Sequence, residues 1–299
     1  MRVVFSAQFR QISEEINRTA ADLANAQNLV SSGRRIQKPS DDPAGASSSV
    51  TDHAALGALD AYTKTTDSAT SRLTVVDTTL SDIVNKLEAA QTAVMSARGS
   101  SVSQSRRDAA AANLQGIADA LVSDLNAEFH GAYLFSGTLA TTAPYTVAAG
   151  VVSPYKGNTS TMAVDLGQGH PLTVAFDGSS IAQGSDAADV FTVIADLITA
   201  IQTGDPTGTA IATGMAGLER AATRATLMQT QVGTNLNALD DARARLSAVR
   251  LDVTAQLSKT EDANMASAIT QMSQADTAYR AALGAFSKVG TVSLMDYLR

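Results

Sequence analysis

The side chains that could support catalysis or bind a metal are few and scattered in this sequence. Its histidines, His53, His130 and His170, have no Asp, Glu or second His at helical or zinc-binding spacing, which favours structural or surface roles. Asp41 and Asp42 are adjacent carboxylates without further ligands at a calcium-loop spacing. No cysteine is present, so disulfides, zinc–thiolate sites and thiol nucleophiles are excluded. The sequence therefore predicts no catalytic residue, cofactor site or metal site.

An enzymatic site in the glycine-rich stretch 139–185 is an alternative of a different class. Asp165, Asp177 and His170 lie in it, but a small β-rich region of any function would contain as much. The segment 167–171, Gly-Gln-Gly-His-Pro, lacks the Lys-Ser/Thr of a phosphate loop and is typical of a hairpin turn. Neither Gly-x-Ser-x-Gly nor His-Glu-x-x-His occurs. These patterns favour a structural protein over an enzyme.

The strongest periodic signal lies at the two ends of the chain. Apolar residues recur there at alternating spacings of four and three, a period that places them on one seam of a helix. The N-terminal seam is Phe5, Phe9, Ile12, Ile16, Thr19, Leu23, Ala26 and Val30. The C-terminal seam is Met265, Ile269, Met272, Tyr279, Leu283 and Phe286, with a polar break at Asp276. Because a seam needs a partner, we expect the two ends to pack against each other and against neighbouring subunits.

Capping signals divide the remaining helices. Gly33 suits a left-handed C-cap of the first helix, while Asp42 and Pro43 suit the N-cap and first residue of a second. This second helix is expected to reach Arg98, with Gly57 as a point of interruption. Its seam is Leu73, Val76, Leu80, Ile83, Leu87, Ala90 and Val94.

Three further helices are expected. The first starts after Ser103, buries Leu114, Ile117, Leu121 and Leu125, and ends at His130-Gly131. Another starts near Ala187 and ends at the Gly204-Asp205-Pro206 break. A longer one follows, because apolar residues recur there every seven positions. They are Leu218, Ala225, Val232, Leu239, Leu246 and Val253.

The predicted fold class is mainly α, an elongated antiparallel helical bundle or coiled-coil rod formed by the N- and C-terminal segments, with a small β-rich inserted domain. Short β-rich pieces at 145–147, 161–164 and 172–176 are separated by Gly and Pro, which predicts strands joined by turns. The expected domains are a terminal coiled coil, a helical rod and an outer insertion. Their ranges are 1–38 with 260–299, 39–138 with 186–259, and 139–185.

Composition excludes several classes of partner. Apolar residues make up 44% of the chain but aromatic residues only 4%, which suits narrow helical seams better than one thick core. A net charge of −7 and no cluster of Lys and Arg with aromatics argue against nucleic acid. No run approaches the roughly 20 apolar residues that span a membrane. The N-terminus has the pattern of an amphipathic helix rather than of a signal peptide, so if the protein leaves the cell, we expect it to do so without a cleaved leader.

The most specific string is Ser-Ser-Gly-Arg-Arg-Ile-Gln-Lys-Pro-Ser-Asp-Asp-Pro-Ala-Gly-Ala, residues 31–46. It resembles the signature of the flagellin superfamily, in which Ser/Thr-Gly-Lys/Arg-Arg-Ile precedes Asp-Asp-Pro/Ala. The motif residues are Gly33, Arg34, Arg35, Ile36, Pro39, Ser40, Asp41, Asp42 and Pro43. Two features resemble the hook–filament junction branch of this superfamily more than flagellin. One is the presence of both Pro39 and Pro43, and the other is the string Gly-Ala-Tyr-Leu-Phe-Ser-Gly-Thr at 131–138.

The resemblance implies a structural subunit of the bacterial flagellum, an extracellular adapter between hook and filament. It implies copies of the chain itself as partners in a ring, a neighbouring hook-associated protein on the hook side and flagellin on the filament side. It also implies type III export with a chaperone that holds the C-terminal region, here 265–298. Arg34 and Arg35 are either a solvated pair or a bridge to a neighbour's carboxylates. Flagellin itself, and a secreted coiled-coil translocator or adhesin, are the alternatives.

Overall fold

The computed structural model describes residues 2–99, 101–148, 150–165, 171–205 and 208–297, without the side chains of 2–9 and 289–297. Its helices are α1 (Arg2–Ser32), α2 (Pro43–Ala97), α3 (Gln104–Leu125), α4 (Gly178–Ala182), α5 (Val190–Thr203), α6 (Thr209–Glu261) and α7 (Met265–Tyr297). The chain divides into two compact units. The terminal unit comprises the residues up to Leu59 and from Ala248 onward, and the bundle unit comprises Asp60–Ser247.

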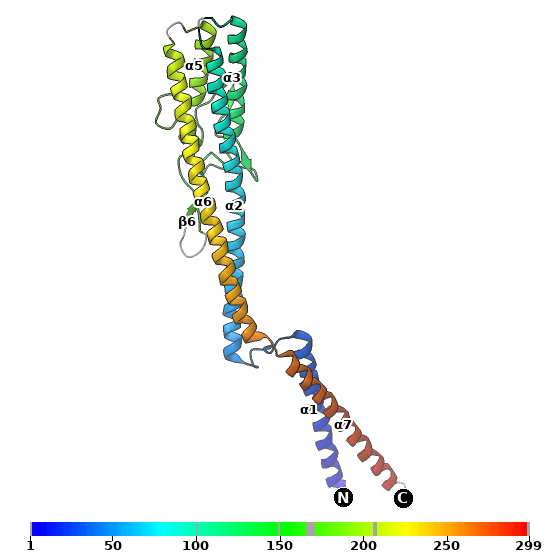
Figure 1. Ribbon diagram of the computed structural model, residues 1–299. Coiled ribbons are helices and arrows are strands. Elements are labelled where there is room, and N and C mark those ends of the chain that lie inside the picture. Colours follow the sequence, from blue (N-terminus) through cyan, green and yellow to red (C-terminus); the bar gives the residue numbers. More distant parts are fainter. Residues whose placement is uncertain (1, 100, 149, 166–170, 206–207, 298–299) are drawn as a thin grey trace. The chain divides into compact units, whose positions relative to one another are not determined.

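In the terminal unit, α1 packs against α7 (Figure 1). The two helices are antiparallel, because the end of α1 meets the start of α7 in a bridge between Arg34 and Asp262. Gly33 has a φ of +68°, and its amide nitrogen donates to Leu29 O at 3.0 Å. The predicted pairing of the two ends and the predicted glycine C-cap are both confirmed.

In the bundle unit, α2, α3, α5 and α6 share one hydrophobic core. The predicted seam of α2 is buried from Leu73 to Val94, and α6 contributes Leu218, Ala225, Val232 and Leu239, each 0% exposed. The last two members of the predicted α6 stripe, Leu246 and Val253, are only partly buried. A mainly helical fold with a small β-rich part, as predicted, is confirmed.

The β-rich part consists of three antiparallel hairpins among the described residues. They pair β1 (Glu128–Phe129) with β2 (Ala132–Tyr133), β3 (Val147–Ala148) with β4 (Val151–Val152), and β5 (Ala163–Asp165) with β6 (Pro171–Thr173). Tyr145, Val174 and Phe176 are nearly fully buried and belong to the same core as the helices. The insertion therefore packs onto the bundle. The turn predicted at 167–171, with His170, lies largely outside the described residues.

The sequence prediction for the end of the third helix is wrong. α3 ends at Leu125, and His130-Gly131 is the turn of the β1–β2 hairpin. Both turn residues have positive φ, 52° and 77°, as a two-residue hairpin turn with the strand twist requires. A histidine followed by glycine serves this turn as well as it serves a helix end, so the dipeptide alone does not distinguish the two.

Three smaller differences concern helix bounds. α2 continues through Gly57, whose missing Cβ faces open space, so the glycine neither causes nor relieves a close contact. α5 begins at Val190 rather than near Ala187, because the Asp189 carboxylate accepts from the Thr192 amide at 2.8 Å. The short helix α4 was not predicted.

No described helix contains an apolar stretch that could cross a membrane.

Candidate assembly surface

The paired helices of the terminal unit leave much of their apolar seam uncovered. On α1, Ala26 is buried, whereas the larger Ile12, Ile16, Leu23 and Val30 are each partly exposed. Phe5 and Phe9 belong to α1, but their side chains lie outside the described residues. The small Ala26 is thus more fully covered than these larger seam residues of α1.

The same pattern holds on α7. Ala268 is 1% exposed, whereas Met265, Ile269 and Leu283 are 41%, 50% and 42% exposed. Met272, Tyr279 and Phe286 are partly buried, and the polar break at Asp276 forms an ion pair with Arg280 at 3.0 Å. The structure therefore pairs the two helices that carry the predicted seams, and it leaves Met265, Ile269 and Leu283 open.

The motif loop, residues 33–42, joins α1 to α2 and is hydrogen-bonded to the link between α6 and α7. The Arg35 amide donates to Glu261 O at 2.6 Å, and the Ala263 amide donates to Gly33 O at 2.8 Å. These two backbone bonds flank the Arg34–Asp262 bridge. The most specific part of the sequence is thus the place where the two ends of the chain are joined.

The side chains of Arg35 and Asp42 are hydrogen-bonded to each other across the motif loop. The Arg35 guanidinium donates two hydrogen bonds to Asp42 Oδ2, both 3.1 Å, and one to Thr260 O at 2.8 Å. Asp42 Oδ1 accepts from the Gly45 amide at 2.9 Å, which confirms Asp42 as the N-cap of α2 and Pro43 as its first residue. The Gly45 amide, and then Arg35, hold the pKa of Asp42 below its usual value.

Asp41 orders the turn before this cap. Its Oδ2 accepts from the Lys38 amide at 2.9 Å and from the Gln37 amide at 3.0 Å, and these bonds lower the pKa of Asp41. A Cβ on Gly45 would lie 2.6 Å from Ile36 Cδ1 and 2.6 Å from Asp42 Oδ2, so a larger residue here would have to displace the capping carboxylate. The remaining motif residues, Pro39, Ser40 and Pro43, are exposed.

Glu261, the last residue of α6, is the centre of a buried polar cluster. The residue is 7% exposed, and its carboxylate accepts a hydrogen bond from the Ser49 hydroxyl and lies 2.9 Å from His53 Nε2. Arg34 Nε lies 3.6 Å from the other carboxylate oxygen. The Ser49 bond, and then His53 and Arg34, hold the pKa of Glu261 below its usual value despite burial. One carboxylate thus connects the motif loop, α2 and α6.

Asp52, one turn of α2 from Ser49, is a second buried carboxylate in the terminal unit. The residue is 8% exposed, and its Oδ1 lies 3.5 Å from Gln256 Nε2 of α6. Its Oδ2 has no hydrogen-bond partner in the described part of the chain. Sequence reasoning missed both Asp52 and Glu261, because their partners are 200 or more residues away and no motif links them.

The second family string anchors the β-rich insertion in the bundle unit. Leu134, Phe135 and Ser136 are each 0% exposed, and Phe135 O accepts from the Gly178 amide and the Tyr155 hydroxyl, both at 2.9 Å. Asp177 accepts from the Ser179 amide at 2.8 Å and caps α4, which is a structural role for this candidate carboxylate.

Comparisons with known proteins agree with this geometry. A family model described as the bacterial flagellin N-terminal helical region matches residues 7–140. Flagellar hook-associated protein 3 of Escherichia coli is 25% identical over 98% of this chain and 98% of its own length. The protein of the same name from Salmonella typhimurium is 23% identical over the full length of both.

Solved structures show the same fold. A flagellar hook-associated protein of Vibrio parahaemolyticus matches with a TM-score of 0.69 at 20% identity, covering 74% of this chain and 100% of that one. The chain is similar to flagellins over residues 7–140 and to hook-associated proteins over nearly its full length. The predicted resemblance is confirmed, and the full-length relatives bear the name of a hook-associated protein rather than of flagellin. The region matched by the flagellin model contains the entire motif loop and most of α1.

Proposed function

We propose that this chain is a structural adapter of the bacterial flagellum that joins the hook to the flagellin filament. The observation that carries the proposal is the open apolar seam of the α1–α7 pair beside the motif loop. The full-length similarity to proteins named flagellar hook-associated protein 3 supports the same role. An adapter needs a surface that is completed only by neighbouring subunits, and this helix pair offers one.

The proposed driving force for assembly is burial of the seam. Each large apolar side chain that becomes fully buried contributes about 1.5–3 kcal/mol. Met265, Ile269 and Leu283 are each 41–50% exposed in the isolated chain, so a large part of that gain is still available. Ordering the helices opposes assembly by about 1–2 kcal/mol per residue. When several subunits bury this seam against one another, the gain offsets the cost of ordering. The two ends of the chain would then become fully ordered only as the subunit joins the assembly.

The motif loop is proposed to hold both ends of the chain in register for this assembly. Glu261 connects Arg34 of the loop with Ser49 and His53 of α2, and Arg35 connects Asp42 with Thr260 O. The side chain of Arg34 is 56% exposed and that of Arg35 50% exposed. Each arginine therefore keeps donors available for a carboxylate of a neighbouring subunit, in addition to its partner within the chain.

The proposed partners are further copies of this chain in a ring, a hook-associated protein on the hook side and flagellin on the filament side. We further propose export by the flagellar type III route without a cleaved leader, with a chaperone covering 265–298. The division into terminal coiled coil, helical rod and outer insertion also stays a proposal. No catalytic role is proposed, because the similar proteins are named for their place in the flagellum.

Deletion of the gene tests the proposal. Hooks should persist on the cells, filaments should be lost, and flagellin monomers should appear in the medium. Re-expression of the chain should restore filaments. Cells that lack the gene and still carry normal filaments would contradict the adapter role.

The same cells separate the adapter from flagellin. A filament subunit is the main protein in filaments sheared from cells, whereas a junction protein is scarce there. Quantifying this chain against flagellin in sheared filaments gives a direct ratio. If this chain is the most abundant protein, it is the filament subunit, and the adapter proposal is wrong.

A further inference from the structure

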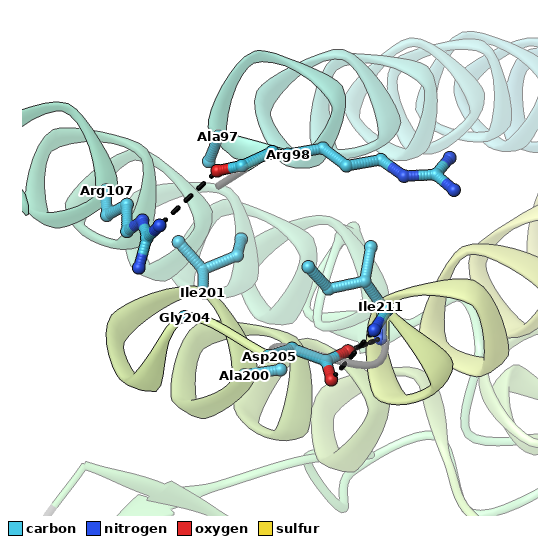
Figure 2. A pocket seen from close by; sticks show the side chains of 10 residues that line it. Ala97, Arg98, Arg107, Ala200, Ile201, Gly204, Asp205 and Ile211 are labelled. Atoms are coloured by element: carbon cyan, nitrogen blue, oxygen red, sulfur yellow. Dashed lines mark hydrogen bonds between the residues drawn. The ribbon is translucent and has the colours of Figure 1, made fainter. Parts of the chain in front are cut away.

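A small cavity lies at the end of the bundle unit, where four helix ends meet (Figure 2). These are the ends of α2 and α5 and the starts of α3 and α6. The cavity has a volume of about 300 Å³, and its floor is formed by buried aliphatic residues. Those floor residues are Ala97, Ala200, Ile201 and Ile211. Arg98 and Arg107 line its wall.

Arg107 is held in position at this cavity. Its Nη2 donates to Gly99 O at 3.3 Å, the bond drawn at Arg107 in Figure 2. Its Nη1 lies against Gly204, the left-handed C-cap of α5, where a Cβ would be only 2.2 Å from that nitrogen. Glycine at 204 therefore serves two purposes, since it ends the helix and leaves space for the guanidinium. One carbonyl contact still leaves other Arg107 donors available.

Arg98 and Arg106 are two further cations at this end of the bundle, and in Figure 2 the side chain of Arg98 extends away from Arg107. Both side chains are exposed, and neither guanidinium forms a hydrogen bond or an ion pair among the described residues. Some other cations of the bundle unit are paired, for example Lys86 with Asp124 and Arg224 with Asp186. Three arginines without a carboxylate partner within residues 98–107 are notable in a chain whose net charge is −7.

The nearby carboxylates are already engaged. Asp205 accepts from the Gly208 amide at 3.1 Å and from the Ile211 amide at 3.0 Å, so it caps the start of α6. Asp108 accepts from Gln104 Nε2 at 2.9 Å. Among the described residues, Arg98, Arg106 and Arg107 form no ion pair. The end of the bundle is thus rich in guanidinium donors that lack carboxylate partners.

We propose that this end of the bundle docks an acidic segment of a partner protein, whose carboxylates bind Arg98, Arg106 and Arg107. Guanidinium groups bind carboxylates through parallel, charge-assisted hydrogen bonds. The aliphatic floor suits the methylene groups of a glutamate side chain better than a hydrated inorganic anion. Met95, one turn before Arg98 and 56% exposed, extends the surface with an apolar contact that a peptide can use. The arginines come from the end of α2 and the first turn of α3, a spread that suits several carboxylates on one segment.

Binding of a fluorescent polyglutamate peptide to the full chain tests this proposal. Fluorescence anisotropy should report saturable binding that weakens as salt is raised, because exposed charges are screened. The double variant Arg98→Glu, Arg106→Glu should weaken binding about tenfold or more. Neither side chain has a partner among the described residues, so thermal unfolding should be unchanged. A polylysine peptide should not bind.

The matched control is the double variant Lys64→Glu, Arg245→Glu. It makes the same change in net charge at exposed cations elsewhere in the bundle unit, whose side chains also lack partners among the described residues. It should leave peptide binding nearly unchanged. The proposal is overturned by an absence of binding, by equal weakening in both double variants, or by displacement of the peptide by inorganic phosphate at equal concentration. Each of these results leaves the adapter role untouched, because that role rests on the terminal unit.

Discussion

The two compact units use the same apolar spacing and reach very different degrees of burial. In the bundle unit, Leu80 and Leu218 are each 0% exposed, in a core shared by α2, α3, α5 and α6. In the terminal unit, Ile269 and Leu283 occupy equivalent seam positions and are 50% and 42% exposed. Periodicity identifies the face that packs, but the number of partner helices determines how much of that face is covered.

The identity of the buried residues explains the difference further. The most buried apolar positions of the α1–α7 pair are the alanines Ala26 and Ala268. Small residues let two helices approach closely, but they bury little area and so contribute little free energy. A pair of this kind gains much of its stability from further packing partners. The bundle unit supplies its own partners, whereas the terminal unit leaves its seam open for the assembly that we propose.

The largest expected effect comes from truncating matched residues in the two units. Leu218→Ala should lower the free energy of unfolding of the bundle unit by about 2–5 kcal/mol, because it opens a cavity in a filled core. Ile269→Ala should cost less than about 1 kcal/mol in the isolated chain, because half of that side chain is already exposed. Denaturant titration of both variants measures this. Equal losses would show that the terminal seam is already packed in the free chain.

Removing the buried charge of the terminal unit should have the next largest effect. Glu261→Gln weakens the contacts to Arg34, Ser49 and His53 and should destabilise the terminal unit by about 1–3 kcal/mol. Hydrogen exchange should become faster in the motif loop and unchanged in the bundle unit. Glu14→Gln, an exposed change on α1, is the control. If hydrogen exchange in the motif loop is unchanged in Glu261→Gln, the polar cluster around Glu261 does not hold the loop in place.

The glycine C-cap offers a smaller and purely local effect. Gly33→Ala forces a residue with a Cβ into a φ of +68° without any steric contact, and should cost the terminal unit about 1 kcal/mol. Gly57→Ala, in the middle of α2 with equally open surroundings, should instead be stabilising. Opposite signs in thermal unfolding are the expected result, and a stabilising Gly33→Ala would contradict the left-handed cap.

Acidification should affect the terminal unit more than the bundle unit. The pKa values of Asp41, Asp42 and Glu261 are all lowered, so their stabilisation is complete above their usual values and is lost as pH falls through the lowered ones. In the bundle unit, the pKa shifts of two carboxylates have opposite signs. Burial raises the pKa of Asp124, whereas Arg224 lowers the pKa of Asp186. Hydrogen exchange at pH 7 and about pH 3 should therefore show earlier opening of the motif loop. Simultaneous opening of both units would refute this.

Features that depend on a few neighbouring residues were predictable from the sequence. The caps at Gly33 and Asp42 follow local rules, and the α2 seam from Leu73 to Val94 follows helical period, so each was placed correctly. His130-Gly131 was misplaced because two structures use the same dipeptide. The motif string pointed to the assembly surface, but through resemblance rather than through chemistry.

Long-range polar contacts were out of reach. Glu261 gave no signal, since its partners His53 and Ser49 are 208 and 212 positions away and none of the three belongs to the recognised motif. The buried Asp52 was likewise invisible. The degree to which the terminal seam is covered also depends on partner helices, which periodicity does not count. Such features depend on tertiary packing, which one sequence does not encode in readable local patterns.

The central claim is that the α1–α7 seam is incomplete in the free chain and is completed by assembly. The most direct test expresses the double variant Ile16→Ser, Ile269→Ser in cells that lack the gene, with Leu227→Ser, an exposed apolar position of the bundle unit, as control. We predict that the double variant restores no filaments although its main thermal transition matches the wild type, while Leu227→Ser restores them. Normal filaments on cells carrying the double variant would contradict the account.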